Sequence, residues 1–392
     1  MSEQVYIVAA RRTPIGAFQG ALSPLTSPQL GAAAARAALA DSGLAGEQID
    51  DTIFGCVLMA GLGQAPGRQA ALAAGVPQKV PATTINKMCG SGLKAVMMAS
   101  DQIRAGSANV ILAGGIESMT NAPYLIPKAR GGLRMGHSEI LDHMFFDGLQ
   151  SPFDGKMMGA FAEATAAKYG FTRQQQDEFA AESVRRALAA VESGAFINEI
   201  APVTVKDRKG ERVVDKDETP FTCDIAKIPT LKPAFAKDGT VTAASSSSIS
   251  DGASALLVVS ATAARQYNLK PLARIVGYSS FAQAPEWFTT APVGAIQSVL
   301  SKTGWSANDV DLYEINEAFA VVAMAAMHDI GLPHAKVNVN GGACALGHPI
   351  GATGARILTT LVHSLRNRNL KRGVASLCIG GGEATALAVE II

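Results

Sequence analysis

The chain has 392 residues, of which 48% are hydrophobic and 17% charged, and its formal net charge is +1. This length exceeds what one hydrophobic core usually holds, so two or three domains are expected, and the composition excludes a disordered chain. The near-zero charge gives no indication of binding to nucleic acid or a membrane surface, and every apolar stretch is interrupted well short of a membrane span. The first residues, MSEQVYIVAARRTP, match neither a signal peptide nor a transit peptide, which predicts a cytoplasmic location.

The first block of the chain alternates strands with helices. A strand is expected over residues 5–10, and Ser27 followed by Pro28 indicates the N-cap and first turn of an Ala-rich helix that stops near Gly43. Further segments alternate as far as an apolar strand over residues 110–113, which is expected to end at a pair of glycines. This alternation predicts an α/β fold with a layered sheet.

A second block with the same pattern closes the chain. The spacing of residues in 43–55 repeats in 304–316, at a constant offset of 261 positions. Farther on, each block has a glycine-rich turn before a helix, and each helix leads to a strand that ends in glycines. Any α/β protein shows some internal similarities of this kind by chance, but the matched order of these features favours a duplication into two similar halves.

Residues 119–249 differ from both blocks, because they are polar, rich in Gly and Pro, and lack the strand–helix rhythm. Within them, Thr172 and Gln175 have the spacing of a capping box that opens a helix, with Phe179 and Val184 near one face. A charged hairpin is expected over residues 206–212. The segment is interpreted as an insertion that lies over the core.

The cysteines are free-thiol candidates rather than a framework. They are odd in number, widely spaced and without a CxxC pair, so neither disulfides nor a structural zinc site is expected. A buried free thiol is the default for each of them, and a chemical role needs an activating context. The five are Cys56, Cys89, Cys223, Cys344 and Cys378.

Cys89 has such a context. The run Asn86-Lys87-Met88-Cys89-Gly90-Ser91-Gly92 precedes a helical pattern, which places the thiol at a helix N-terminus. Unpaired N–H groups and the positive end of the helix dipole favour the thiolate and are expected to lower its pKa. A cysteine before a helix is more often structural than catalytic, so Cys89 on its own is a plausible nucleophile and no more.

His348 and Cys378 occupy comparable positions. His348 lies in a glycine-rich loop just before a helix, at the entry that corresponds to that of Cys89, and imidazole is the natural base for a thiol. Cys378 stands at the end of an apolar strand, before three glycines, where α/β proteins commonly build their sites. Two thiols and one imidazole fit acyl transfer followed by enolate formation at a thioester.

Four motifs carry a resemblance to a known family. They are N-x-x-C-G-S-G at residues 86–92, N-E-A-F at 316–319, G-H-P-x-G at 347–351 and C-x-G-G-G at 378–382, and together they resemble the thiolase family from residue 5 to 392. The resemblance implies two duplicated α/β halves in α-β-α-β-α layers with an inserted loop domain. The implied division is 1–118 plus 250–271, 119–249 for the loop domain and 272–392. A homo-oligomer, either a dimer or a tetramer, is also implied.

By that resemblance Cys89 carries the acyl group, His348 activates it, and Cys378 exchanges the α-proton. Asn316 holds a water that completes one oxyanion site with His348, and the N–H groups of Cys89 and Gly380 form the other. Such preorganised donors supply a large part of the rate in acyl transfer.

The loop domain is implied to bind coenzyme A, and no metal and no cofactor beyond the CoA thioesters is expected. The implied CoA and acyl contacts are Ser247, Phe235, Ala243, Met158, Ala318 and Phe319. The serine run at 245–248 could otherwise be a plain linker.

Two departures concern the acyl chain. Short-chain biosynthetic thiolases commonly read His-Met-Gly where this chain reads Met157-Met158-Gly159, and its residues 243–251 are closer to degradative members. The leading hypothesis is condensation of two acetyl-CoA to acetoacetyl-CoA and CoA. The alternatives are a degradative 3-oxoacyl-CoA thiolase of wider chain length, an inactive acyl-CoA- or lipid-binding relative, and a metal- or redox-active Cys/His protein.

Overall fold

The centre of the molecule is one long mixed sheet. The computed structural model describes residues 3–208 and 210–392. The strand order is β12-β13-β14-β11-β1-β10-β5-β3-β4, and the short β2 (Gly16–Ala17) pairs with β10. The bounds are β1 Val5–Arg12, β3 Asp51–Gly55, β4 Ala82–Ile85, β5 Val110–Ser118, β10 Ser250–Ser260, β11 Ala273–Ala282, β12 Leu312–Ile315, β13 Arg372–Ile379 and β14 Glu383–Ile391.

The sheet consists of two similar halves. In one half β3 runs parallel to β4 and β5, in the other β12 runs parallel to β13, and the remaining neighbours are antiparallel. The halves meet where β1 and β11 share two residue pairs, Tyr6 with Arg274 and Ile7 with Ala273. This seam is short, so the packing of helices, rather than strand pairing, holds most of the two halves together.

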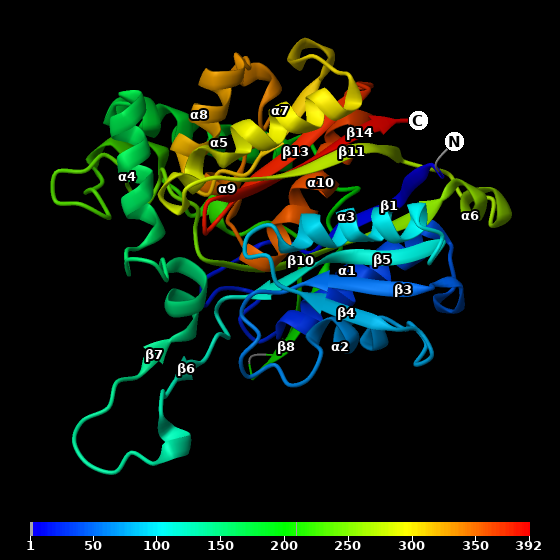
Figure 1. Ribbon diagram of the computed structural model, residues 1–392, viewed down its shortest axis with the longest axis horizontal. Coiled ribbons are helices and arrows are strands. Elements are labelled where there is room, and N and C mark those ends of the chain that lie inside the picture. Colours follow the sequence, from blue (N-terminus) through cyan, green and yellow to red (C-terminus); the bar gives the residue numbers. More distant parts are fainter. Residues whose placement is uncertain (1–2, 209) are drawn as a thin grey trace.

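Helices form three layers around the sheet halves (Figure 1). The middle layer is α3 and α10, whose side chains share one core with strands of both halves, including Leu93, Leu361 and Leu387. The first half is covered outside by α1 and α2, and the second half by α7 and α8. The helix bounds are α1 Ser27–Ser42, α2 Pro66–Ala73, α3 Ser91–Arg104, α6 Ala261–Gln266, α7 Ala291–Thr303, α8 Ala320–Ile330, α9 Ala343–Leu346 and α10 Ile350–Asn367.

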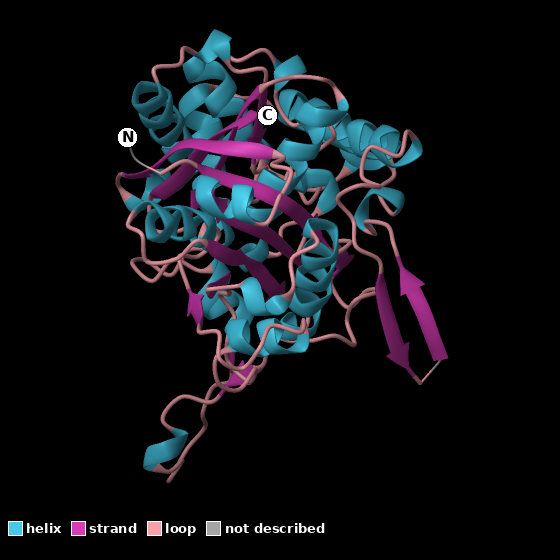
Figure 2. Cartoon of the chain, turned by 90° about the vertical axis from the view of Figure 1, so that its right-hand side faces the viewer, coloured by secondary structure: helices cyan, strands magenta, loops and turns pink. Residues whose placement is uncertain are grey.

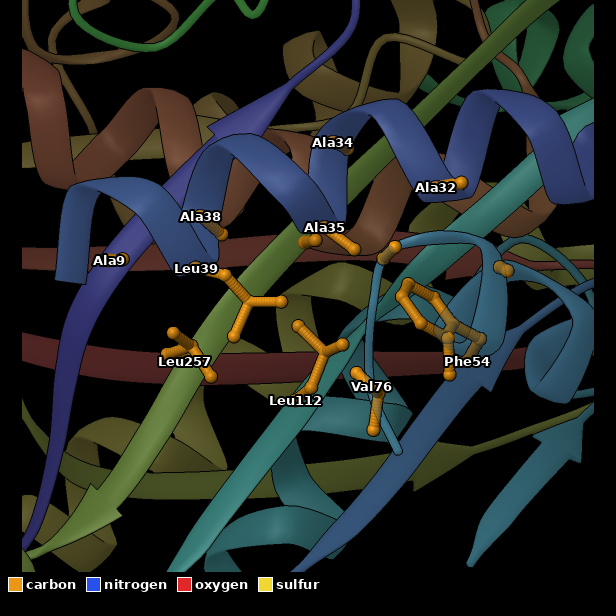
Figure 3. Packing of buried hydrophobic residues seen from close by; sticks show 14 of the residues in the cluster. Ala9, Ala32, Ala34, Ala35, Ala38, Leu39, Phe54, Val76, Leu112 and Leu257 are labelled. Atoms are coloured by element: carbon orange, nitrogen blue, oxygen red, sulfur yellow. The ribbon is translucent and has the colours of Figure 1, made fainter. Parts of the chain in front are cut away.

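The outer core of the first half shows why this arrangement is stable. In Figure 3, Leu39 of α1 meets Leu112 and Leu257 of the sheet, and Phe54 fills the space beside them. Small alanines along the buried face of α1 let the helix lie close to the strands. Burial of this apolar surface is the main favourable contribution to folding. The predicted α-β-α-β-α layering is confirmed.

The predicted duplication is also confirmed in detail. Gly43 after α1 and Gly304 after α7 both adopt the left-handed conformation, with φ of 71° and 69°. Each is followed by a short 3-10 helix, η1 (Gly46–Gln48) or η7 (Ala307–Asp309), and then by β3 or β12. The offset of 261 positions therefore describes equivalent structural elements.

Two local predictions are wrong. The strand expected to end at a glycine pair continues through Gly114 and Gly115 as β5. A Cβ on Gly115 would lie 2.2 Å from the carbonyl oxygen of Gly351, so this glycine permits close packing of α10 rather than a turn. The N-cap of α1 is Thr26 instead of Ser27, because the Thr26 N–H donates to Gln29 Oε1 at 2.8 Å.

The segment between β5 and β10 lies over one end of these layers. Its elements are β6 Tyr124–Leu125, β7 Leu141–Asp142, the π-helix η3 Met144–Leu149, α4 Met158–Tyr169, α5 Arg173–Glu192, β8 Val203–Asp207 and β9 Gly210–Val214, with short 3-10 turns η2 Ala129–Gly131, η4 Thr219–Phe221 and η5 Ile225–Thr230. Figure 2 shows the β8–β9 hairpin at one side of the molecule. Two further 3-10 turns, η6 Pro285–Thr290 and η8 His334–Lys336, belong to the second half.

The capping box at the start of α5 is confirmed: the Gln175 N–H donates to Thr172 Oγ1 at 3.2 Å, and the Thr172 N–H to Gln175 Oε1 at 2.8 Å. On its apolar face Val184 packs against Ala345 and Leu346 of the second half.

The predicted hairpin over 206–212 is formed, apart from Lys209, which lies outside the described residues. None of the helices in the described part of the chain is long and apolar enough to cross a membrane. The domain boundaries at 118/119, 249/250 and 271/272 stay a prediction.

Candidate active site

Cys89 lies in a tight turn between β4 and α3. The preceding Met88 has φ of 46°, a left-handed conformation that is unusual for a residue with a side chain. The turn is held from within, because the Lys87 N–H donates to Ser91 Oγ at 2.8 Å and Ser91 Oγ donates to the Met88 carbonyl at 2.6 Å. Strain of this kind persists only where the surroundings impose it, and it is concentrated at functional positions.

His348 lies in the corresponding turn before α10, and its tautomer follows from its neighbours. The Thr353 hydroxyl donates its single hydrogen to the Pro349 carbonyl at 2.9 Å, so it accepts from His348 Nδ1, 2.7 Å away. Nδ1 therefore carries the proton, and Nε2 is left as the basic nitrogen. Asn316 Nδ2 lies 3.5 Å from that Nε2.

The imidazole is neutral in this environment. Burial, with a smaller effect of the Arg356 guanidinium, lowers the pKa of His348 to about 3. A neutral imidazole with a free Nε2 can accept a proton from a thiol but does not stabilise a resting thiolate.

The pKa of Cys89 differs from the sequence expectation. Burial raises it to about 11, while the N–H groups of Gly380 and of Cys89 itself face the sulfur and lower it only in part. The prediction of a low pKa from the helix N-terminus is therefore wrong, because the desolvation of this half-buried thiol outweighs the two N–H groups that face it. Cys89 and His348 line the same cavity as a neutral thiol and a neutral imidazole.

Cys378 and Gly380 come from the end of β13 and the loop that follows it. Cys378 is fully buried, and burial together with the nearby Cys89 raises its pKa well above the usual range. It is therefore a protonated thiol beside the nucleophile. The Gly380 N–H reaches Cys89 from the second half of the molecule. Both backbone donors that sequence reasoning assigned to one oxyanion site thus converge on the same sulfur.

These groups open into a cavity of about 400 Å³. Of the eleven predicted site residues, all within the described part of the chain, nine line it, and Asn316 and Cys378 lie directly behind His348 and Cys89. The nine are Cys89, Met158, Phe235, Ala243, Ser247, Ala318, Phe319, His348 and Gly380.

The serine run is part of this cavity and not a linker. The Ser247 N–H and Oγ both donate to the Ala318 carbonyl at 3.0 Å, and the Ser248 carbonyl accepts from the His348 N–H at 3.1 Å. Phe235 packs edge-on against Phe319, with ring centroids 5.8 Å apart. A Cβ on Gly159 would fall 2.3 Å from the Phe235 ring, so the glycine of the Met-Met-Gly run is what admits this aromatic ring.

Sequence reasoning missed several apolar residues of the wall. Most lie in the inserted segment, where no periodicity marks them, and two belong to the π-helix η3, a rare element that is frequent at functional sites. They include Met119, Phe145, Leu149, Phe288 and Ile350. Their common signal is an apolar side chain in otherwise polar sequence.

Two buried carboxylates support the catalytic turns. Glu117 accepts from the N–H groups of Leu58 at 3.2 Å and Gly351 at 2.9 Å, and burial raises its pKa to about 7. Glu317 accepts from Ser183 Oγ at 2.7 Å and from the Cys344 N–H at 3.1 Å. Cys344, which the sequence left unassigned, is thereby part of the support of the N-E-A-F motif.

No cluster of three or more metal-ligating side chains occurs among the described residues. That the reaction requires neither a metal nor a cofactor stays a prediction.

Comparison with known proteins gives one consistent result. Residues 5–262 match the model of the thiolase N-terminal domain and residues 269–391 that of the thiolase C-terminal domain. The chain is 51% identical to an acetyl-CoA acetyltransferase of Pseudomonas aeruginosa, over 98% of each chain. It is 49% identical to acetyl-CoA acetyltransferase 2 of Arabidopsis thaliana, over 99% of this chain and 97% of the relative.

A solved structure agrees with these relatives. The crystal structure of the Bacillus anthracis acetyl-CoA acetyltransferase matches with a TM-score of 0.97 at 43% identity, and the match covers 100% of this chain and 99% of that one. Family, sequence and fold coincide over the whole chain, and this chain belongs to the thiolase family.

Proposed function

We propose that the chain is an acetyl-CoA acetyltransferase, which interconverts two acetyl-CoA with acetoacetyl-CoA and CoA. The observation that carries the proposal is that Cys89 and His348 line one cavity, with Cys378 next to Cys89 and two backbone N–H groups directed at the Cys89 sulfur. The relatives named acetyl-CoA acetyltransferase support the same reaction.

In the cleavage direction Cys89 passes its proton to His348 Nε2 as the sulfur attacks the 3-keto carbon of acetoacetyl-CoA. The C2–C3 bond breaks, and the departing enolate takes the Cys378 proton at carbon, which leaves acetyl-CoA and a Cys378 thiolate. CoA then gives its thiol proton to Cys378 and attacks the acetyl-Cys89 carbonyl, and Cys89 leaves with the proton from His348. Two acetyl-CoA result, every group returns to its starting state, and condensation is the reverse.

The oxyanions of these steps would be stabilised by the donors around them. The N–H groups of Cys89 and Gly380 suit the oxygen of the acyl group on Cys89. Asn316, beside His348 Nε2, suits the oxygen of the second thioester. One such donor is typically worth about 3 kcal/mol in the transition state.

One observation favours a second candidate, a 3-oxoacyl-CoA thiolase of wider chain length. Apolar side chains line much of the cavity, with Met157 where short-chain relatives commonly have histidine. Turnover of acetoacetyl-CoA, 3-oxohexanoyl-CoA and 3-oxodecanoyl-CoA tests this directly. The proposal expects the highest kcat/KM for acetoacetyl-CoA, and a preference for the decanoyl substrate would contradict it.

The remaining parts of the proposal concern binding and assembly. Phe235, Ala243, Met158, Ala318, Phe319 and Ser247 would contact the pantetheine and acyl groups of the substrates, with no further cofactor. A homo-oligomer in the cytoplasm is part of the same proposal. Mass spectrometry after mixing with acetyl-CoA separates an enzyme from an inactive CoA-binding relative, because only the enzyme gains an acetyl group on Cys89.

A further inference from the structure

The two backbone donors at Cys89 belong to different halves of the molecule. The Cys89 N–H is at the entry to α3 in the first half, and the Gly380 N–H follows β13 in the second half. The sheet seam between the halves comprises two residue pairs of β1 and β11. The packing of α3 on α10 joins the two halves, and contacts between the catalytic turns add to it where the donors stand.

One of these contacts is steric. Gly90 packs on Ile379, the last residue of β13, and a Cβ on Gly90 would lie 2.4 Å from Ile379 Cδ1. This contact limits how closely the turns approach, but it does not prevent them from separating.

The loop after β13 is held at its far end, where the Gly382 carbonyl accepts from the Gln283 N–H at 2.8 Å. Gly381 and Gly382 have φ of 95° and 90°, a conformation that glycine adopts freely. The loop is fixed where β14 begins, at Glu383, which pairs with Ile379 across the hairpin. The positions of Glu383 and Gln283 therefore set the position of the Gly380 N–H.

An ion pair joins this point to the Cys89 turn. Lys87 Nζ contacts Glu383 Oε2, and the two residues are 296 positions apart in the sequence. Lys87 belongs to the rigid part of its turn, since its N–H bonds Ser91 Oγ and its carbonyl accepts from the Gly90 N–H at 3.1 Å. A displacement of Lys87 is thus transmitted to Cys89.

We propose that Lys87 and Glu383 form a positioning pair, which holds the Cys89 and Gly380 N–H groups at the separation required for the acyl oxyanion. The inference rests on the proposed function. The side chains are 26% and 36% exposed, so the pair contributes little to folding, and its effect falls on the reaction. Neither side chain lines the cavity; each acts through the backbone of its own turn.

The test compares Lys87→Gln, Glu383→Gln and the charge swap Lys87→Glu/Glu383→Lys with the native enzyme in thiolysis of acetoacetyl-CoA. Each single variant should lose about tenfold in kcat, less than removal of a donor, because the donor is displaced but still present. KM should change less than about twofold, since binding of CoA is not altered. The swap should recover most of the loss.

Glu390→Gln is the matched control. Glu390 is on the same strand as Glu383 and pairs with Arg274 at 2.6 Å, away from the cavity. It should keep native kcat, and every variant should melt within about 2 °C of the native protein.

Native kcat in both single variants, or a swap no better than the single variants, would overturn the positioning role. Failure of the proposed function gives a different result, because the native protein itself would not turn over acetoacetyl-CoA. Alkylation of Cys89 by iodoacetamide does not use the oxyanion donors, so its rate should be the same in all variants; a parallel loss would mean that the pair orders the thiol instead.

Discussion

The turns that enter α3 and α10 occupy equivalent places in the two halves, yet they are held in different ways. The Cys89 turn is closed by hydrogen bonds within it, through Ser91 and the left-handed Met88, and Lys87 adds one ion pair to the other half. The backbone of the His348 turn is held by distant segments, with the Ser248 carbonyl on the His348 N–H and Glu117 of the other half on the Gly351 N–H. A duplicated scaffold thus supplies the same position twice, and the local bonding decides whether it carries a nucleophile or a base.

The largest effect should come from removing the base of the second turn. His348→Ala should lower the single-turnover rate of Cys89 acetylation by about 10³-fold, because a neutral thiol with a raised pKa then has no proton acceptor. Rapid-quench mass spectrometry measures this rate. His328→Gln, at an exposed histidine, serves as the control. An unchanged acetylation rate in His348→Ala would show that His348 is not the base that accepts the Cys89 proton.

The pH dependence of the first turn gives the next effect. Since the pKa of Cys89 is raised to about 11 and that of His348 lowered to about 3, both groups are neutral between pH 5 and pH 9. The thiolate fraction then increases tenfold for each pH unit, so alkylation of Cys89 should accelerate about 100-fold from pH 7 to pH 9. A plateau reached below pH 8 would show that the helix entry does activate the thiol.

The smallest effect should come from the support of the imidazole. Thr353→Val keeps the shape of the side chain but removes the acceptor for Nδ1–H, so the wrong tautomer becomes populated and kcat should decrease about tenfold. Thr359→Val is the control, because Thr359 is also buried on α10 but bonds Ser254 and lies away from His348. Equal kcat in the two variants would mean that packing alone orients the ring.

The sequence allowed the layered fold, the duplication and the position of the reacting groups to be predicted, because glycines and chain order mark the catalytic turns locally. The ionisation of Cys89 was not predictable in this way, since burial by distant segments exceeds the local influence of the helix. The cavity wall was missed for a similar reason: Phe145 and Phe288 are brought together by tertiary packing and follow no local period. Gly115 was misinterpreted for the same reason. From its neighbours in the sequence this glycine indicates the end of a strand, but in the structure it allows the close contact with α10.

The place of β10 in the sheet has a consequence for biosynthesis. This strand lies between β1 and β5, although more than 130 residues separate it from the end of β5 along the chain. On a ribosome the first half cannot complete its sheet until the whole insertion has been made, which takes roughly 7 to 26 s at about 5–20 residues per second. During that interval the edges of β1 and β5 are unpaired and open to wrong partners. The nascent chain is therefore most dependent on chaperones before Ser260 emerges.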